Sequence, residues 1–264
     1  MHDQGAGPIP SLNLPQLVAP AQNQHYEGSY GDAMLQWRGI SAVDKVANMR
    51  AMLAAAGAGP IAHVLEVGCG TGAVLLETKR AGIGAEHCGI DLADPSAHPH
   101  PGVTEAGLAL AAYDGMTIPF GDASHDLVYA SHVLEHVPDE RGFLAELARV
   151  AAKWLYIEVP CEIHFRTTMR DLQTTLNIGH INAFTPETLA LTLSSAGLPP
   201  RDVQIFDHSM EVHRWRTSAM KARAKAMMRR GLLAASPRLA SKIFTYHAGA
   251  LIDMERIRQS PRGV

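Results

Sequence analysis

A glycine-rich segment between a short apolar run and a helical pattern is the part of this sequence best suited to hold a ligand. The run at residues 63–67 leads into Gly68-Cys69-Gly70-Thr71-Gly72, and a helical pattern follows at 73–80. Glycine allows a tight turn and lets a ligand approach the backbone without a Cβ clash. A helix that begins after such a turn stands at the carboxyl edge of the sheet, where open α/β sheets bind ligands. The spacing therefore predicts a ligand site at residues 68–72.

Acidic side chains follow the next two predicted strands. Asp91 ends the strand predicted at residues 87–91, and Asp114 follows the strand predicted at 108–113. A carboxylate at the first of these positions can accept hydrogen bonds from both hydroxyls of a ribose. The pattern Gly68-x-Gly70-x-x-Ala73 also satisfies the dinucleotide fingerprint, which is a weak signal by itself. NAD, another ribose-containing cofactor and a glycine turn with no ligand are therefore the competing interpretations at this point.

The elements that must position these residues alternate between strand and helix patterns. Strands are predicted at residues 63–67, 87–91, 108–113, 126–131, 154–159 and 203–206, and helices at 36–56, 73–80, 139–152 and 186–196. Ser41 is the expected cap of the first helix. This alternation predicts an α/β, Rossmann-like doubly wound, mostly parallel sheet with helices on both faces. The Pro-rich segment between Asp91 and Leu108 is expected to be an irregular crossover.

Charge and composition divide the chain into three parts. Residues 1–24 hold four prolines and read as a flexible leader, and residues 25–208 carry the ligand-binding domain with an N-terminal helical lid. Residues 1–208 hold 11 Lys and Arg against 23 Asp and Glu, a balance of −12. Residues 209–264 hold 12 against 3, a balance of +9, and are expected to form a basic, helical C-terminal extension.

Composition also excludes several classes of protein. The 264 residues are 47% hydrophobic, and no apolar run approaches the ~18 residues of a membrane span. The N-terminus lacks the pattern of a secretory signal, and the three cysteines are widely spaced without a Cys-x-x-Cys pair. We therefore expect a reduced, cytoplasmic protein without a disulfide framework.

Several motifs together resemble the class I S-adenosylmethionine-dependent methyltransferases, in particular their small-molecule branch, which acts on saccharides and secondary metabolites. The resemblance covers about residues 64–198 and is carried by the segments 66–72, 89–91, 114–120, 126–131, 133–139 and 179–189. It implies S-adenosylmethionine as cofactor, held by Glu66, Gly68, Cys69, Gly70, Gly72, Asp91, Leu92, Asp114, Gly115 and Ser131. In this family the backbone of the glycines lies against the methionine part of S-adenosylmethionine. The residue that matches Ser131 begins the segment beside the methyl group that is transferred. The resemblance further implies that Asp91 holds the ribose, Leu92 packs on the adenine and Asp114 binds its amino group.

Methyl transfer requires alignment of acceptor, methyl group and sulfur rather than covalent help from the protein. An acidic site suits the sulfonium cation of this cofactor, whereas a pyrophosphate would favour basic groups. If the acceptor is a hydroxyl, a general base adds about 10²–10⁴-fold, and His136, His164 and His180 are the candidates. Glu158, at the end of a strand, is a candidate for holding an acceptor hydroxyl.

The letters His132-Val133-Leu134-Glu135-His136 match the H-x-x-E-H zinc-protease signature. That chemistry needs both histidines on one formed helix, whereas this segment directly follows a strand and meets Pro138. We therefore expect no metal at these residues and no hydrolase.

Two outlying segments have open interpretations. The aromatic stretch at residues 26–38 either packs on the core or closes over the cofactor through Tyr30 or Trp37. The basic segment Arg214–Arg230 either packs on the sheet, with Met220, Ala224 and Met227 as its apolar stripe, or contacts an anionic substrate or membrane surface. No nucleic-acid-binding module is evident, so no nucleic acid is expected as a partner.

The sequence thus predicts a methyltransferase that uses S-adenosylmethionine and acts on a small-molecule or glycan-type acceptor, at oxygen by analogy with the branch. Carbon methylation of a quinone-like lipophilic ring is the alternative within enzymes. A protein that binds the cofactor without catalysis is the alternative outside them.

Overall fold

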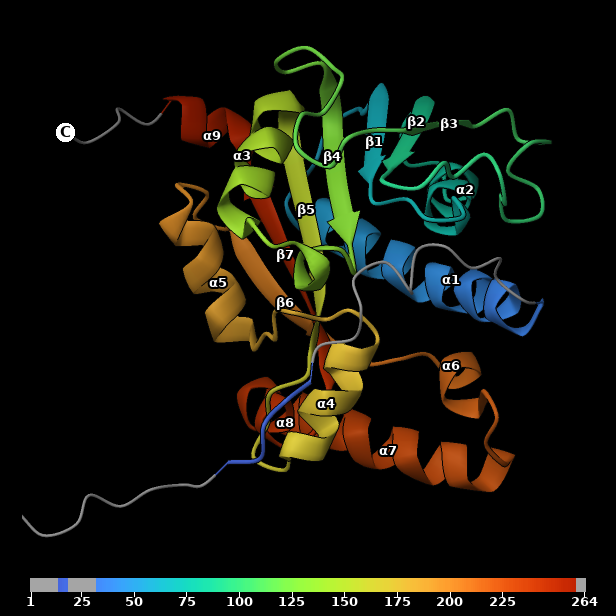
Figure 1. Cartoon of the computed structure of the whole chain (residues 1–264), viewed down its shortest axis with the longest axis vertical. Helices are drawn as coiled ribbons and strands as arrows, with labels where there is room; N and C mark the ends of the chain where they lie inside the picture. The colour runs from blue at the N-terminus through green and yellow to red at the C-terminus, as the bar shows by residue number, and fades with distance from the viewer. Residues whose placement is uncertain (1–13, 19–31, 260–264) are drawn as a thin grey trace, which may run out of the picture.

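The computed structural model describes residues 14–18 and 32–259 of the chain (Figure 1). Of the leader predicted at residues 1–24, only 14–18 lie in the described part, and Tyr30 lies outside it. Among the described residues, no helix combines the length and apolar character that crossing a membrane requires.

One seven-stranded sheet runs through the molecule in the order β3-β2-β1-β4-β5-β7-β6 (Figure 1). The first five of these strands pair in parallel, and β7 is antiparallel to both of its neighbours. The mostly parallel α/β fold is therefore confirmed. The strands are β1 (His63–Val67), β2 (Glu86–Asp91), β3 (Ala109–Ala112), β4 (His125–Ser131), β5 (Ala151–Cys161), β6 (Asp202–Phe206) and β7 (Tyr246–Asp253).

Helices cover both faces of the sheet and build a core on each. The helices are α1 (Asp32–Ala55), α2 (Ala73–Arg80), α3 (Glu140–Val150), α4 (Met169–Asn177), α5 (Pro186–Ser195), α6 (Met210–Arg214), α7 (Ala219–Ala235), α8 (Pro237–Ile243) and α9 (Met254–Gln259), with a 3-10 turn η1 (Leu134–His136). One core joins apolar residues of α1 and α2 to the sheet, among them Met49, Met52 and Leu75. The other joins α3 and α5 to the opposite face, through Leu144, Leu147 and Leu189 among others.

Local sequence signals place most of these boundaries. β1 and α2 occupy the predicted residues, and Asp139 caps α3 by accepting a hydrogen bond of 2.9 Å from the N–H of Gly142. The crossover between β2 and β3 contains no helix, as expected. Ser41 is not a cap, because α1 already includes Asp32 and the Ser41 hydroxyl donates back to the carbonyl of Arg38 at 3.2 Å.

The segment after residue 208 differs from the helical extension expected there. It contains β7, which lies between β5 and β6 and completes the sheet. β7 is buried along nearly its whole length, and a Cβ at Gly249 would lie 2.7 Å from the hydroxyl oxygen of Tyr156. Small residues suit this crowded position but have low strand propensity, which is why the sequence pattern does not reveal the strand.

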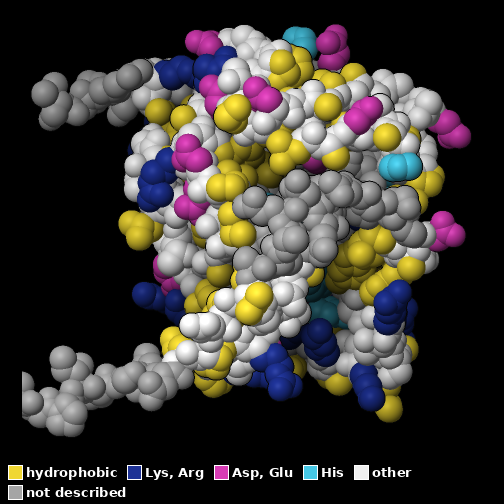
Figure 2. Space-filling model, viewed as in Figure 1, with side chains coloured by type: hydrophobic (Ala, Val, Ile, Leu, Met, Phe, Trp, Pro, Cys, Tyr) yellow, Lys and Arg dark blue, Asp and Glu magenta, His cyan; other side chains and the backbone are white. Residues whose placement is uncertain are grey.

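Helix α7 packs through a different face from the one predicted. Met220 and Met227 are 79% and 73% exposed, whereas Ala222, Ala226 and Arg229 are buried. The predicted apolar stripe of α7 is therefore wrong, since small alanines make the contact and the methionines face outward. Figure 2 shows Lys and Arg side chains gathered over the lower part of the molecule, where α7 lies.

Candidate active site

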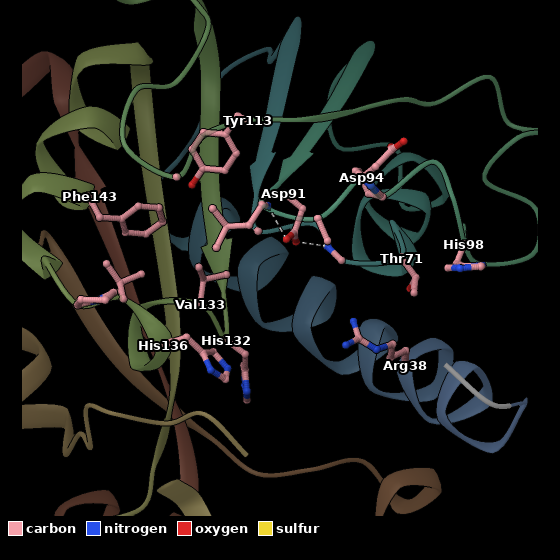
Figure 3. Close-up of a pocket in the computed structure, with 18 residues that line it drawn as sticks. Arg38, Thr71, Asp91, Asp94, His98, Tyr113, His132, Val133, His136 and Phe143 are labelled. Atoms are coloured by element: carbon pink, nitrogen blue, oxygen red, sulfur yellow. Dashed lines mark hydrogen bonds between the residues drawn. The ribbon is translucent and has the colours of Figure 1, made fainter. Parts of the chain in front are cut away.

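A cavity of about 240 Å³ opens at the carboxyl ends of β1, β2 and β4 (Figure 3). Among the residues predicted from the sequence, Gly68, Gly70, Asp91, Leu92, Gly115 and His136 line it. The sheet thus brings together residues that are up to 68 positions apart in the chain, namely Gly68 and His136. The location is the one at which open α/β sheets bind ligands.

The glycine loop between β1 and α2 forms the floor of the cavity. Gly68, Gly70 and Gly72 have φ of 78°, 53° and 75°, a region that other residues rarely adopt. A Cβ at Gly68 would lie 2.4 Å from a methyl carbon of Val133, and one at Gly70 would lie 2.6 Å from Arg38. Only glycine fits these positions without displacing a neighbour, so the backbone itself forms the surface that a ligand meets.

Asp91 stands at the end of β2 with its carboxylate already oriented (Figure 3). Its oxygens accept hydrogen bonds from the N–H of Gly70 at 2.6 Å and the N–H of Leu92 at 2.7 Å. A carboxylate oxygen carries two lone pairs, so acceptor capacity remains for ligand hydroxyls. Leu92 beside it is an apolar side chain that is 53% exposed and lines the cavity.

Glu66 lies beneath the glycine loop and does not line the cavity. It is 2% exposed and accepts a hydrogen bond of 3.2 Å from the hydroxyl of Tyr129. Burial raises the pKa of Glu66 to about 8, against the opposing charge of Lys45 and the Tyr129 hydrogen bond. A carboxyl group in this state would lose its proton only when a bound cationic ligand stabilises the carboxylate.

The other predicted cofactor residues stand around the cavity in different roles. Cys69 is buried, and burial raises the pKa of its thiol, which disfavours the thiolate. Gly72 precedes α2 as its N-cap. The Asp114 carboxylate accepts hydrogen bonds of 2.8 Å from the N–H groups of Met116 and Thr117, so it closes its own turn rather than lining the cavity. The Ser131 hydroxyl is buried without a hydrogen-bond partner.

The three candidate bases occupy three different surroundings. His136 lines the cavity, and its Nδ1 lies 3.0 Å from the carbonyl oxygen of Gly179. His180 packs edge-on against His136 at a ring-centroid distance of 4.7 Å. Its Nδ1 lies 2.9 Å from the Glu162 carboxylate, which outweighs burial and raises the pKa of His180. His164 lies outside the cavity lining, with its ring within 3.3 Å of the hydroxyls of Thr167 and Thr245.

The H-x-x-E-H residues do not form a helix that could present both histidines together. η1 spans only Leu134–His136, and His132 precedes it with a positive φ of 59°. Glu135 is fully buried, and burial raises its pKa to about 7. The arrangement of a zinc protease helix is therefore absent from this segment.

Sequence reasoning missed several residues that line the cavity, chiefly Arg38, Thr71, Tyr113, His132 and Val133. Arg38 belongs to α1 and reaches over Gly70, whereas the neighbouring Trp37 packs against Trp215 at a ring-centroid distance of 5.7 Å. Trp37 therefore does not line the cavity, and Arg38 is the residue through which this stretch contributes to it. In the sequence, the one signal for a role of Arg38 is its position at the end of the aromatic stretch.

The residues present fit the cofactor that the sequence suggests. The cavity combines an oriented carboxylate at Asp91, a bare glycine backbone and the guanidinium of Arg38, which can face a carboxylate. The hydroxyl of Thr71 is buried at its edge without a hydrogen-bond partner. The cavity therefore offers suitable contacts for the ribose, the methionine end and the adenine ring of S-adenosylmethionine.

Comparison with known proteins identifies the same family. A family model described as a methyltransferase domain matches residues 42–202. Two curated relatives are a protein of Oryza sativa subsp. japonica named "Probable tocopherol O-methyltransferase, chloroplastic", 39% identical over 103 residues, and the ajmaline N-methyltransferase of Rauvolfia serpentina, 29% identical over 108 residues. These matches cover 34% and 39% of this chain but only 26% and 36% of the relatives, so the chain spans about a third of their length or less.

A solved structure shows the same fold. The magnesium protoporphyrin IX methyltransferase of Synechocystis PCC 6803, with bound SAH, superposes with a TM-score of 0.54 at 15% sequence identity. The match covers 86% of this chain and 89% of that one. The similarity therefore extends over the sheet and its helices.

Proposed function

Since the chain belongs to the methyltransferase-domain family of class I S-adenosylmethionine-dependent methyltransferases, we propose that it transfers a methyl group from S-adenosylmethionine to a small-molecule acceptor, at an oxygen atom. The observation that carries this proposal is the joint geometry of the glycine loop and Asp91 at the edge of the sheet. S-adenosylmethionine supplies the electrophilic methyl group when it is bound.

The chain's own residues would bind and orient that cofactor. Asp91 would accept the ribose hydroxyls, and the backbone of Gly68 and Gly70 would lie against the methionine end. Arg38 would face the methionine carboxylate, while ionised Glu66 beneath the loop would favour the ammonium and sulfonium charges. Leu92 would lie against the adenine.

The acceptor would approach from the side of His136, which lines the same cavity. A histidine at this position can take the proton of an acceptor hydroxyl as the methyl group moves. Apolar residues also line this side, namely Val133, Val137, Pro138 and Phe143, and they would exclude water from the reacting atoms. An acceptor with an apolar body and one nucleophilic oxygen fits this wall best. The relative named as a probable tocopherol O-methyltransferase supports that choice.

The proposal is tested by calorimetry followed by methyl transfer. S-adenosylhomocysteine should bind to the full chain at a stoichiometry of one, and NAD should not bind. Transfer of a labelled methyl group from S-adenosylmethionine should then be measured over a panel of phenols, sugars, amines and quinol rings. NAD binding without S-adenosylhomocysteine binding would overturn the cofactor assignment. Transfer only to amines or to ring carbon would overturn the choice of oxygen, and cofactor binding without transfer would favour the non-catalytic alternative.

We also propose that the outward face of α7 recruits an anionic acceptor or surface. Arg223, Lys225 and Arg230 are exposed on it, next to the exposed Met220, Met227 and Met228. Cations that alternate with apolar side chains on one exposed face suit a surface carrying both negative charge and hydrocarbon. A cytoplasmic location stays a prediction.

A further inference from the structure

A second group of chemically reactive side chains lies beside the cavity and is not used by the proposed methyl transfer. His132 follows β4, Glu158 stands on β5, and His247 stands on β7. In the antiparallel register Glu158 faces Gly249 and Pro160 faces His247, so both side chains project from the same face of the sheet. The three side chains meet at the carboxyl end of the parallel strands although 115 positions separate the two histidines.

Three atoms of this group converge on one point. His132 Nε2 lies 2.8 Å from His247 Nδ1 and 3.7 Å from Glu158 Oε1, and His247 Nδ1 lies 3.6 Å from the same oxygen. Three atoms with these separations have a common centre about 2.0 Å from each, which is the length of a bond from Zn²⁺ to imidazole nitrogen or carboxylate oxygen.

Hydrogen bonding alone does not satisfy this group. One proton can occupy the line between the two imidazole nitrogens, because each neutral ring carries a single N–H. Glu158 Oε1 then receives no hydrogen, and it is buried without a hydrogen-bond partner. A buried acceptor in this state is costly. A single cation at the common centre would satisfy all three atoms at once.

Against the expectation of no metal at residues 132–136, we propose that His132 binds one divalent transition-metal ion together with His247 and Glu158, with Zn²⁺ as the ion that the donor set favours. Two neutral imidazoles and one carboxylate are the protein ligands of many catalytic zinc sites. Mg²⁺ and Ca²⁺ prefer sites made of oxygen atoms alone, so two nitrogen donors disfavour both.

The second nitrogen or oxygen of each ligand lies beside a neighbouring polar group, and such neighbours orient the ligands of metal sites. His132 Nδ1 lies 3.5 Å from Oε1 of the buried Glu135. Glu158 Oε2 accepts hydrogen bonds from the hydroxyl of Tyr156 at 2.5 Å and from the amide of Asn48 at 3.1 Å. His247 Nε2 lies 3.1 Å from Nε2 of His208. Hydrogen bonds thereby orient the Glu158 carboxylate and the His247 ring, whereas the contact of His132 with Glu135 is longer than an ordinary hydrogen bond.

Backbone strain points to the same place. His132 adopts a φ of 59°, a conformation that costs energy for a residue with a Cβ. Its N–H is fixed by a hydrogen bond of 2.8 Å to the carbonyl of Glu158. Strained residues of this kind concentrate at functional sites. The strain here accompanies the placement of the imidazole beside Glu158.

The site adjoins the cavity through His132. The side chain of His132 is 22% exposed and lines the cavity next to His136 (Figure 3), whereas Glu158 is fully buried. Three protein ligands would leave one coordination position free for a further ligand. An acceptor oxygen or nitrogen could occupy it, an assignment that rests on the proposed methyl transfer, whereas the metal site itself does not.

Metal binding is tested on the untagged full chain, stripped with a chelator and then titrated with Zn²⁺ alone. We expect one equivalent to bind by calorimetry and elemental analysis. His247→Gln and Glu158→Gln should each weaken binding at least tenfold, while His125→Gln, which removes a buried histidine outside the group, should not change it. His180→Gln tests the neighbouring set Glu135, His136 and His180 and should also leave binding unchanged.

A readout on the unsubstituted protein covers the case in which a variant does not fold. Co²⁺ in place of Zn²⁺ should give the intense visible absorption of a four-coordinate site with nitrogen and oxygen ligands. Binding well below one equivalent, absent cobalt bands, or loss of binding in His180→Gln but not in His247→Gln would overturn the site. S-adenosylhomocysteine titration of the metal-free protein tests the cofactor separately, so either proposal can fail while the other stands.

Discussion

The carboxylate of Asp91 accepts a hydrogen bond of 2.6 Å from the backbone N–H of Gly70, 21 residues earlier in the chain. This contact ties the loop after β1 to the end of β2 and fixes the carboxylate before any ligand arrives. A preoriented acceptor loses little conformational entropy on binding, so its hydrogen bonds contribute to affinity in full.

Asp91→Ala should weaken the binding of S-adenosylhomocysteine by about 1.5–3 kcal/mol, the value of a hydrogen bond that involves a charged group. Calorimetry measures this change directly. Asp94→Ala is the matched control, because Asp94 lines the same cavity but its carboxylate is engaged by Ser96. An equal loss in both variants would show that general charge rather than ribose recognition determines affinity.

Gly68→Ala should destabilise the fold more than Gly57→Ala does, although both glycines have similar positive φ of 78° and 69°. Gly57 has open space around its Cβ position, so its substitution costs only backbone strain of about 1–2 kcal/mol. At Gly68 the added Cβ would also lie 2.4 Å from a methyl carbon of Val133, a steric clash that comes on top of the strain. Urea unfolding measures the difference, and Val133→Ala should recover part of it in the double variant. Equal losses at the two glycines would contradict the steric account.

The glycine loop could be predicted from the sequence because its parts are contiguous. A strand, a turn and a helix within residues 63–80 carry local signals of period and turn chemistry, and Asp91 follows one crossover later. Each of these residues reaches the cavity through short connections whose geometry is restricted.

The histidine and glutamate group could not be predicted in the same way. His247 reaches His132 only because β7 inserts between β5 and β6, and that insertion depends on pairing between distant segments. The small residues of β7 give no strand signal. Arg38 likewise enters the cavity through the packing of α1, which the period of the helix does not determine.

His136→Gln should lower kcat by about 10²–10⁴-fold with an oxygen acceptor, since a general base contributes on that scale. Affinity for S-adenosylhomocysteine should stay within twofold of the parent. His164→Gln serves as the control, because its ring contacts Thr167 and Thr245 outside the cavity lining and should leave kcat unchanged. Steady-state kinetics with both variants would reject the role of His136 if its kcat matched the parent.

Glu66→Gln should reduce the dependence of stability on pH. Burial raises the pKa of Glu66 to about 8 in the folded protein, above its ordinary value of 4.5. Between these values the folded state keeps a proton that the unfolded state has lost, so the free energy of unfolding falls as pH rises. One such group contributes a slope of up to about 1.4 kcal/mol per pH unit.

Urea unfolding at several pH values from about 5 to about 8 measures this slope. The Gln variant should show a shallower fall than the parent, although Glu135, whose pKa is also raised by burial, preserves part of it. The exposed Glu105 supplies the control Glu105→Gln, which should follow the parent. Identical slopes in Glu66→Gln and the parent would contradict a protonated Glu66.

The cationic side chains of α7 should differ in their effect on stability: one is buried and stabilises the fold, and several are exposed to solvent. Arg229 is 4% exposed, pairs with Asp207 at 2.7 Å and lies 4.2 Å from the ring centre of Tyr246. Arg229→Gln leaves Asp207 buried without its guanidinium partner and should destabilise the protein by about 3–5 kcal/mol. Thermal or urea unfolding measures that loss.

The exposed cations should affect partners rather than stability. In the triple variant Arg223→Gln, Lys225→Gln and Arg230→Gln, each substitution should change the free energy of unfolding by no more than about 0.5 kcal/mol, as surface substitutions do. It should abolish binding to vesicles that contain anionic lipid, or raise KM for an anionic acceptor, with cofactor affinity unchanged. Salt should weaken the parent's interaction in the same way, because exposed charges are screened over about 8–10 Å at physiological ionic strength. A parent that binds no anionic vesicle, together with a triple variant of unchanged KM, would leave α7 with a structural role alone.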